Sequence, residues 1–235
     1  MASAVPHNDV STVRRGDGRR GLAVAGFAYV AAWLVGLLVA PSAPDPDASD
    51  ATVNAFYADH QSATLLQAAL VHCVAGLALA GFVVALARRV ATGPGDGNRT
   101  VFLAAGLAAA VVSLIQFGME VALNRHVAGD GSASTTASLF DAVNIADTVK
   151  LVLLGVTVFA ATRFLAGVRA VPRWLEALGY ALLPVLVVGG AAFVVNSGAL
   201  SAVLSASLLL LLLWVAAVTV VETRRQPPPP RPATV

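Results

Sequence analysis

The chain has few charged residues and no long polar stretch. Only 12% of its 235 residues are charged, whereas 57% are hydrophobic, and its mean hydropathy is +0.78. These values lie far outside the range of soluble globular proteins. No polar connection between apolar runs exceeds about 25 residues, which is too few to bury a separate core. We therefore expect a single membrane domain.

Cysteine and lysine each occur once. Because Cys73 is alone, no intramolecular disulfide or multi-cysteine metal site can form. The four histidines have no short ligand spacing, and no nucleophile or phosphate-binding loop accompanies them. We therefore predict no metal, no cofactor and no catalytic residue. One lysine beside fourteen arginines, with abundant Ala, Val, Gly and Pro, indicates a GC-rich bacterium.

Six apolar runs are long enough to cross a hydrocarbon core of about 30 Å as α-helices. They predict an all-α bundle of six transmembrane helices, with spans at 21–40, 62–87, 101–123, 151–168, 178–195 and 200–221. The membrane domain would cover 21–222. A disordered basic tail over 1–20 would precede it, and a proline-rich tail over 223–235 would follow it.

Basic residues are distributed unevenly around the spans. All but two of the fifteen lie in segments on one side of the predicted membrane, and the exceptions are Arg125 and Lys150. Because basic residues resist translocation, both termini should be cytoplasmic and the protein should lie in the bacterial cell membrane. The first run resembles the start of a secretory signal, but proline follows both small-residue cleavage sites, so we expect it to be retained.

The two long outer loops each end in a predicted amphipathic helix, one before the second span and one before the fourth. In the first, Asp50 can cap a helix that places Val53, Phe56 and Tyr57 on one face. The second covers about 139–150, after a Ser and Thr cluster. Aromatic and basic side chains at such positions usually anchor a protein in the membrane interface, and we predict this role for Phe56, Tyr57, Arg173 and Trp174.

Polar side chains inside the spans are the main candidates for function, since an ionised group at mid-membrane costs roughly 2.5–3.5 kcal/mol unless it is paired. Ser113, Gln116, Glu120 and Asn124 recur at spacings of three and four, so they form one stripe on the third span. The stripe either bonds to neighbouring helices or lines a pocket. The candidate pocket residues are Ser113, Gln116, Glu120, His72, Lys150 and Asp147.

Lys150 has two candidate partners. Asp147 lies one turn away, so a solvated ion pair on the same helix is the default interpretation. The alternative is an ion pair with Glu120 across helices. His72 lies in the second span, where a lone histidine more often supports packing than it binds a ligand or carries a proton.

The segment Pro172-Arg173-Trp174-Leu175-Glu176-Ala177-Leu178-Gly179 resembles the Pro-Arg-Trp-Leu-x-x-Leu-Gly segment of uncharacterised six-span membrane proteins of actinobacteria. The segment over 55–60, Ala-Phe-Tyr-Ala-Asp-His, also resembles the part of these proteins that follows their first outer loop. The resemblance covers about 21–221 and implies the six-span topology. It implies no activity.

Three functions are compatible with these patterns. The first is a non-catalytic membrane component that acts through lipid, a membrane-protein partner or a second copy of itself, without nucleic acid. The second is a small-solute or proton-coupled transporter with a polar pocket between the second, third and fourth spans. The third is an intramembrane enzyme that uses Glu120 and His72 as acid and base.

Overall fold

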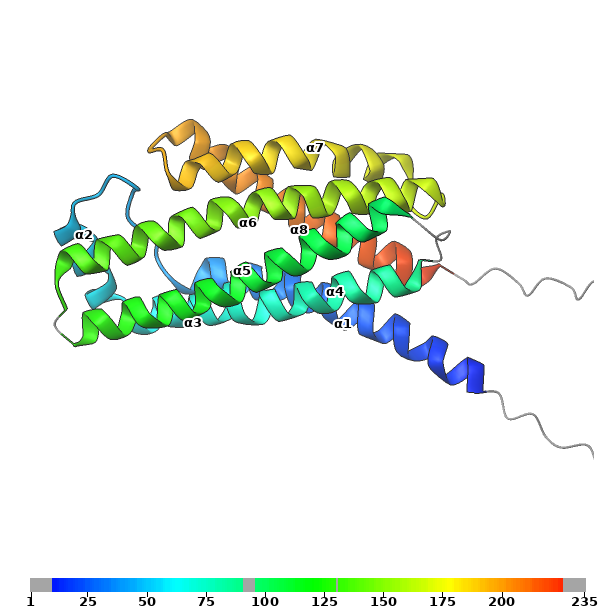
Figure 1. The fold of residues 1–235 in the computed structure, drawn as a ribbon, viewed down its shortest axis with the longest axis horizontal. Helices are drawn as coiled ribbons and strands as arrows, with labels where there is room; N and C mark the ends of the chain where they lie inside the picture. Colours follow the sequence, from blue (N-terminus) through cyan, green and yellow to red (C-terminus); the bar gives the residue numbers. More distant parts are fainter. Residues whose placement is uncertain (1–9, 91–95, 130, 226–235) are drawn as a thin grey trace, which may run out of the picture.

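The computed structural model is a bundle of long helices, without strands in the part of the chain that it describes (Figure 1). It describes residues 10–90, 96–129 and 131–225, with side chains from residue 18 onward. Six of its helical stretches are long and apolar enough to cross a membrane. The predicted all-α, six-span architecture is confirmed.

The spans follow one another in chain order. The elements are α1 (Val10–Val39), α2 (Asp50–Asp59), α3 (Gln61–Ala68), the π-helix η1 (Ala69–Val74), α4 (Ala75–Arg89), α5 (Gly97–Ala128), α6 (Ala133–Gly167), α7 (Arg173–Gly190), the 3₁₀-helix η2 (Ala191–Phe193) and α8 (Gly198–Arg224). Together α3, η1 and α4 form the second span. Each span packs against the next, and α1 packs against both α4 and α8, which closes the ring.

The two ends of the bundle differ. The first span and α8 bring Arg19 and Arg225 together at one end, which we call the arginine-rich end. At the opposite end lies α2 (Figure 1). It packs against α5 and α6, and we call α2 with the adjoining ends of α5 and α6 the cap. That the cap faces outward, as the distribution of basic residues indicates, stays a prediction.

Some predicted boundaries differ from those of the structure. The second amphipathic segment leads directly into the fourth span, because α6 runs unbroken for 35 residues without a proline or glycine between 133 and 151 to interrupt it. The first is a separate helix, but its N-cap is Ser49, whose hydroxyl accepts from the Thr52 amide, and not Asp50. The predicted tail over 1–20 overlaps α1 from Val10 onward. Residues 1–9 and 226–235 lie outside the described part.

The cap has a small hydrophobic core of its own. Val53 and Tyr57 from α2 pack with Leu123 from α5 and Phe140 from α6, apart from the main core of the bundle. The rings of Tyr57 and Phe140 lie 6.2 Å apart in an edge-on arrangement. Tyr57 is only 4% exposed, so its predicted role as an interface anchor is wrong. It points inward because it completes this core.

The other predicted anchors lie nearer the surface. Phe56 is partly exposed beside Tyr57. Arg173 and Trp174 begin α7, and Trp174 is 55% exposed. That Phe56, Arg173 and Trp174 contact lipid headgroups stays a prediction.

Two glycines of α5 have opposite surroundings. A Cβ at Gly106 would lie 2.6 Å from a methyl group of Val83 and 3.2 Å from Thr157. A Cβ at Gly118 would meet nothing within 4 Å. Gly106 therefore permits the close approach of α4 and α6 to α5, whereas Gly118 has no packing role in the monomer.

We predict that Gly106→Ala lowers the melting temperature in detergent and that Gly118→Ala does not. Overpacking a tight helix contact typically costs about 1–3 kcal/mol, and the β-branched neighbour Val83 has little rotamer freedom with which to adapt. Thermal unfolding of the two variants checks this, and an equal effect of both substitutions would contradict the packing.

Candidate functional site

Five buried polar residues from three neighbouring spans meet near the cap. His72 comes from η1, Gln116 and Glu120 from α5, and Asp147 and Lys150 from α6. All five are less than a tenth exposed, and Lys150 is 2% exposed. We call these five residues the ionisable cluster. It includes every predicted pocket residue except Ser113.

An ion pair within α6 is the centre of the cluster. Lys150 Nζ lies 2.5 Å from Asp147 Oδ1, one turn apart. The predicted ion pair is confirmed, but the expectation that it is solvated is wrong, because both residues are buried. The alternative pairing of Lys150 with Glu120 is not formed among the described residues, since the ammonium points to Asp147 and His72 instead.

Lys150 connects α6 to two other spans. Its Nζ lies 3.2 Å from His72 Nδ1. An ammonium group can only donate, so Nδ1 accepts and the imidazole is neutral, with its proton on Nε2. Lys150 Nζ also lies 5.5 Å from the centre of the Trp33 ring in α1, within the range of a cation–π interaction. Sequence analysis missed Trp33, because one aromatic residue inside an apolar run gives no sign of its neighbour.

The π-helix η1 positions His72. A π-turn adds one residue to a helical turn, and such turns occur frequently at functional sites. Residues 69–74 contain no proline or glycine, so nothing in this segment predicts the irregularity. The predicted extent of the second span is therefore right, but the sequence did not predict the π-helix that orients His72.

Two buried oxygens of the cluster lack a hydrogen-bond partner among the described residues. They are Gln116 Oε1 and Glu120 Oε2. The Gln116 amide nitrogen donates to the Val143 carbonyl over 3.3 Å. An unpartnered oxygen in a buried site lowers the stability of the fold by about 1–3 kcal/mol. The cluster therefore has two oxygens that could still accept a hydrogen bond.

Tyr57 of the cap lies over the carboxyl groups. Its pKa is raised far above the usual phenol value, first because the ring is buried and second because Glu120 and Asp147 lie nearby. Tyr57 is therefore a neutral phenol at physiological pH. It adds no charge to the cluster.

A second polar layer separates the cluster from the cap surface. Asn124 links α5 to α3, because its Oδ1 accepts from the Thr64 hydroxyl at 3.0 Å and its backbone carbonyl accepts from Gln61 at 2.8 Å. Its own amide donates to the Glu120 carbonyl. Ser113 is outside both layers: its hydroxyl donates to the Ala109 carbonyl of its own helix. The predicted stripe is thus divided: Gln116 and Glu120 belong to the ionisable cluster, Asn124 belongs to the second polar layer, and Ser113 lies in neither.

Three separate counts place the cluster at one edge of the hydrocarbon core. A core of about 30 Å takes about 20 helical residues. Counted from Arg89, Arg99 and Gly167 at the arginine-rich end, the opposite edge falls at about residues 69, 119 and 147. These positions are where η1 begins and where Glu120 and Asp147 lie. The remaining lengths of α5 and α6 extend past this edge into the cap.

The rest of the bundle interior is apolar. Large buried side chains such as Phe82, Phe102 and Phe164 fill it toward the arginine-rich end. The buried hydroxyls of Thr157 and Thr162 there donate to carbonyls of α6 itself. Among the described residues, the next buried charged side chain is Glu222 at the far end. Apolar side chains therefore separate the cluster from the arginine-rich end.

No protein-family model matches the chain, and no match is found among curated proteins or solved structures. The fold and the site define its class by themselves. The chain is a six-span helical membrane protein with an ionisable cluster at one edge of its core.

We predict that Lys150→Met destabilises the protein by about 3–5 kcal/mol, because Asp147 would be left buried without its cation. The double variant Asp147→Asn/Lys150→Met should recover most of this loss, since no unpaired charge remains. Thermal unfolding in detergent measures both. Arg163→Met is the matched control, because Arg163 lies on the same helix but is exposed; equal losses at 150 and 163 would contradict the assigned pairing.

Proposed function

We propose that the protein is a non-catalytic component of the bacterial cell membrane that senses external protons, with Glu120 as the proton-binding group and the cap as the responding element. The observation that carries this proposal is the charge imbalance of the ionisable cluster. It holds two carboxyl groups, one ammonium group and one neutral imidazole.

The cluster is electrically neutral only with one additional proton. Asp147 and Lys150 compensate each other at 2.5 Å, and His72 is neutral because it accepts from Lys150. No cation among the described residues forms an ion pair with Glu120. An ionised Glu120 would therefore give the buried cluster one net negative charge, which a low-dielectric surrounding strongly disfavours. A proton on Glu120 removes that charge.

The cap is the element that would respond. Tyr57 of α2 lies next to Glu120, so the charge of Glu120 acts directly on α2. The core of the cap is small, with Val53, Leu123 and Phe140 as its other buried members. Small peripheral units open at lower free energy than the main core. A single added charge beneath α2 is thus sufficient to change how often the cap opens.

Proton-coupled transport is the second candidate, and the π-helix that carries His72 favours it. Against it stands the apolar interior between the cluster and the arginine-rich end. The enzymatic alternative has less support, because Lys150 occupies the His72 nitrogen that would act as a base.

We predict that stepping the external pH changes the protonation of Glu120 in proteoliposomes. Infrared difference spectra should show the carbonyl band of a protonated carboxylic acid at low pH. Glu120→Gln should remove this band, and Asp141→Asn should retain it, since Asp141 is an exposed carboxylate on the cap side of α6. A band that persists in Glu120→Gln would exclude Glu120 as the proton carrier.

The response of the cap is tested separately by hydrogen exchange in α2. After correction for the intrinsic base catalysis of exchange, wild-type α2 should exchange faster as pH rises, because ionised Glu120 places an uncompensated charge against the buried Tyr57 of α2. In Glu120→Gln this pH dependence should disappear. Trapping a pH-sensitive dye inside the vesicles distinguishes transport, since a sensor leaves the internal pH unchanged.

A further inference from the structure

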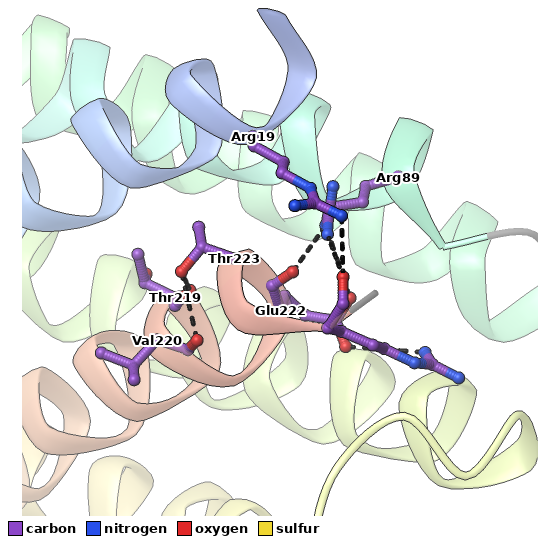
Figure 2. A network of polar contacts seen from close by, with 7 residues as sticks. Arg19, Arg89, Thr219, Val220, Glu222 and Thr223 are labelled. Atoms are coloured by element: carbon purple, nitrogen blue, oxygen red, sulfur yellow. Dashed lines mark hydrogen bonds and ion pairs between the residues drawn. The ribbon is translucent and has the colours of Figure 1, made fainter. Parts of the chain in front are cut away.

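Three arginines converge at the arginine-rich end, where α1, α4 and α8 meet. They are Arg19 near the start of the first span, Arg89 at the end of α4 and Arg225 just after α8. Figure 2 shows Arg19 and Arg89 pointing toward the end of α8 and the carboxyl group of Glu222. We call Arg19, Arg89, Arg225 and Glu222 the arginine cluster. Sequence analysis placed these arginines on one side of the membrane but did not predict that they meet.

Glu222 and the last carbonyls of α8 hold the cluster together. Arg89 Nε donates to the Glu222 carbonyl at 2.8 Å and lies 3.7 Å from Glu222 Oε2. Arg225 Nη1 lies 3.7 Å from Glu222 Oε1. Arg19 and Arg89 each donate from Nη2 to the Arg225 carbonyl at 3.2 Å. Cations near the C-terminus of a helix are further stabilised by its dipole.

The cluster carries two positive charges more than it neutralises, because three guanidinium groups surround one carboxylate. The carboxylate side chain of Glu222 is 2% exposed, whereas the side chains of Arg89 and Arg225 are 16% and 42% exposed. Each guanidinium has five N–H donors, and the internal bonds use only a minority of them. The buried acid thus pairs with Arg89 and Arg225, and most guanidinium donors of the cluster have no acceptor among the described residues.

We propose that the arginine cluster binds the phosphate of an anionic phospholipid headgroup. Its position fits this ligand: Arg89 is the last residue of its span, and Arg19 and Arg225 lie within one residue of the ends of theirs. Guanidinium groups bind phosphate through paired N–H donors, and basic pockets between transmembrane helices are typical sites for such headgroups. A lipid that bridges α1, α4 and α8 would also reinforce the closure of the ring.

The chain supplies a matched control for this site. Arg20 and Arg88 neighbour Arg19 and Arg89 on the same helices, but they are exposed and, among the described residues, form no hydrogen bond or ion pair with Glu222 or Arg225, whereas Arg19 and Arg89 are partly buried. The variants Arg19→Gln/Arg89→Gln and Arg20→Gln/Arg88→Gln therefore remove the same charge from the same end of the same spans. Only the first pair removes the cluster.

The test measures how much phosphatidylglycerol remains bound after delipidation from vesicles of phosphatidylglycerol and phosphatidylcholine, using native mass spectrometry. Wild type and Arg20→Gln/Arg88→Gln should retain the anionic lipid, and Arg19→Gln/Arg89→Gln should retain it on the order of tenfold less. Phosphatidylcholine should not be retained by any of the three. Equal retention of phosphatidylglycerol by both double variants would overturn the site.

Two further arms keep the result interpretable. If Arg19→Gln/Arg89→Gln does not fold, the single variant Arg19→Gln replaces it, since within the described part of the chain Arg19 makes one hydrogen bond to a backbone carbonyl and no ion pair; unchanged retention in that variant counts against the site. Inorganic phosphate is added to lipid-free protein as the second arm. If it raises the melting temperature as much as phosphatidylglycerol does, the ligand is free phosphate, and the lipid assignment is wrong.

Discussion

The burial of one ammonium group governs the cap side of this protein. Lys150 is almost completely enclosed, and an isolated charge in such a place would cost several kcal/mol. Three helices stabilise the buried charge of Lys150. Asp147 comes from α6, the acceptor nitrogen of His72 from η1 and the ring of Trp33 from α1. The helices cannot shift relative to one another without breaking one of these contacts, so the charge fixes their register.

The cap follows from the depth of this cluster. Glu120 and Asp147 lie at the edge of the hydrocarbon core, where water would otherwise reach them and weaken the ion pair. Because α5 and α6 continue beyond that edge, they provide a surface on which α2 can pack. Tyr57 covers the carboxyl groups and also completes the apolar core of the cap. One residue therefore links the stability of the cap to the charge beneath it.

Features set by sequence period were predictable. Runs of about 20 apolar residues gave the six spans, and spacings of three and four placed Gln116 and Glu120 on one face and paired Asp147 with Lys150. Features set by which helices are neighbours were not. The contact of Lys150 with His72 depends on the packing of both η1 and α6 against α5, and the π-turn has no local sequence signal. Tyr57 was assigned to the interface because an amphipathic helix does not reveal what covers its apolar face.

Glu222 shows the same limit at the opposite end. In the sequence it is one acid before two arginines, a pattern typical of a solvated helix end, yet it is 1% exposed. Glu222 is buried because Arg89, which lies in a span more than a hundred residues earlier, packs against it. Local spacing cannot show the contact between Arg89 and Glu222. The paired arginines at the ends of the first, second and sixth spans do indicate that these three ends lie on the same side of the membrane.

The two clusters have opposite charge imbalances and lie at opposite ends of the bundle. The cap cluster has one carboxyl group more than its cations compensate, so it favours a proton. The arginine cluster has two cations more than its acid compensates, so it favours an anion. The cytoplasmic leaflet of a membrane is the one with negative surface potential, so the proposed lipid site agrees with the predicted orientation, in which the arginine-rich end faces the cytoplasm. In that predicted orientation the cap would face outward, and the apolar interior of the bundle lies between the two clusters.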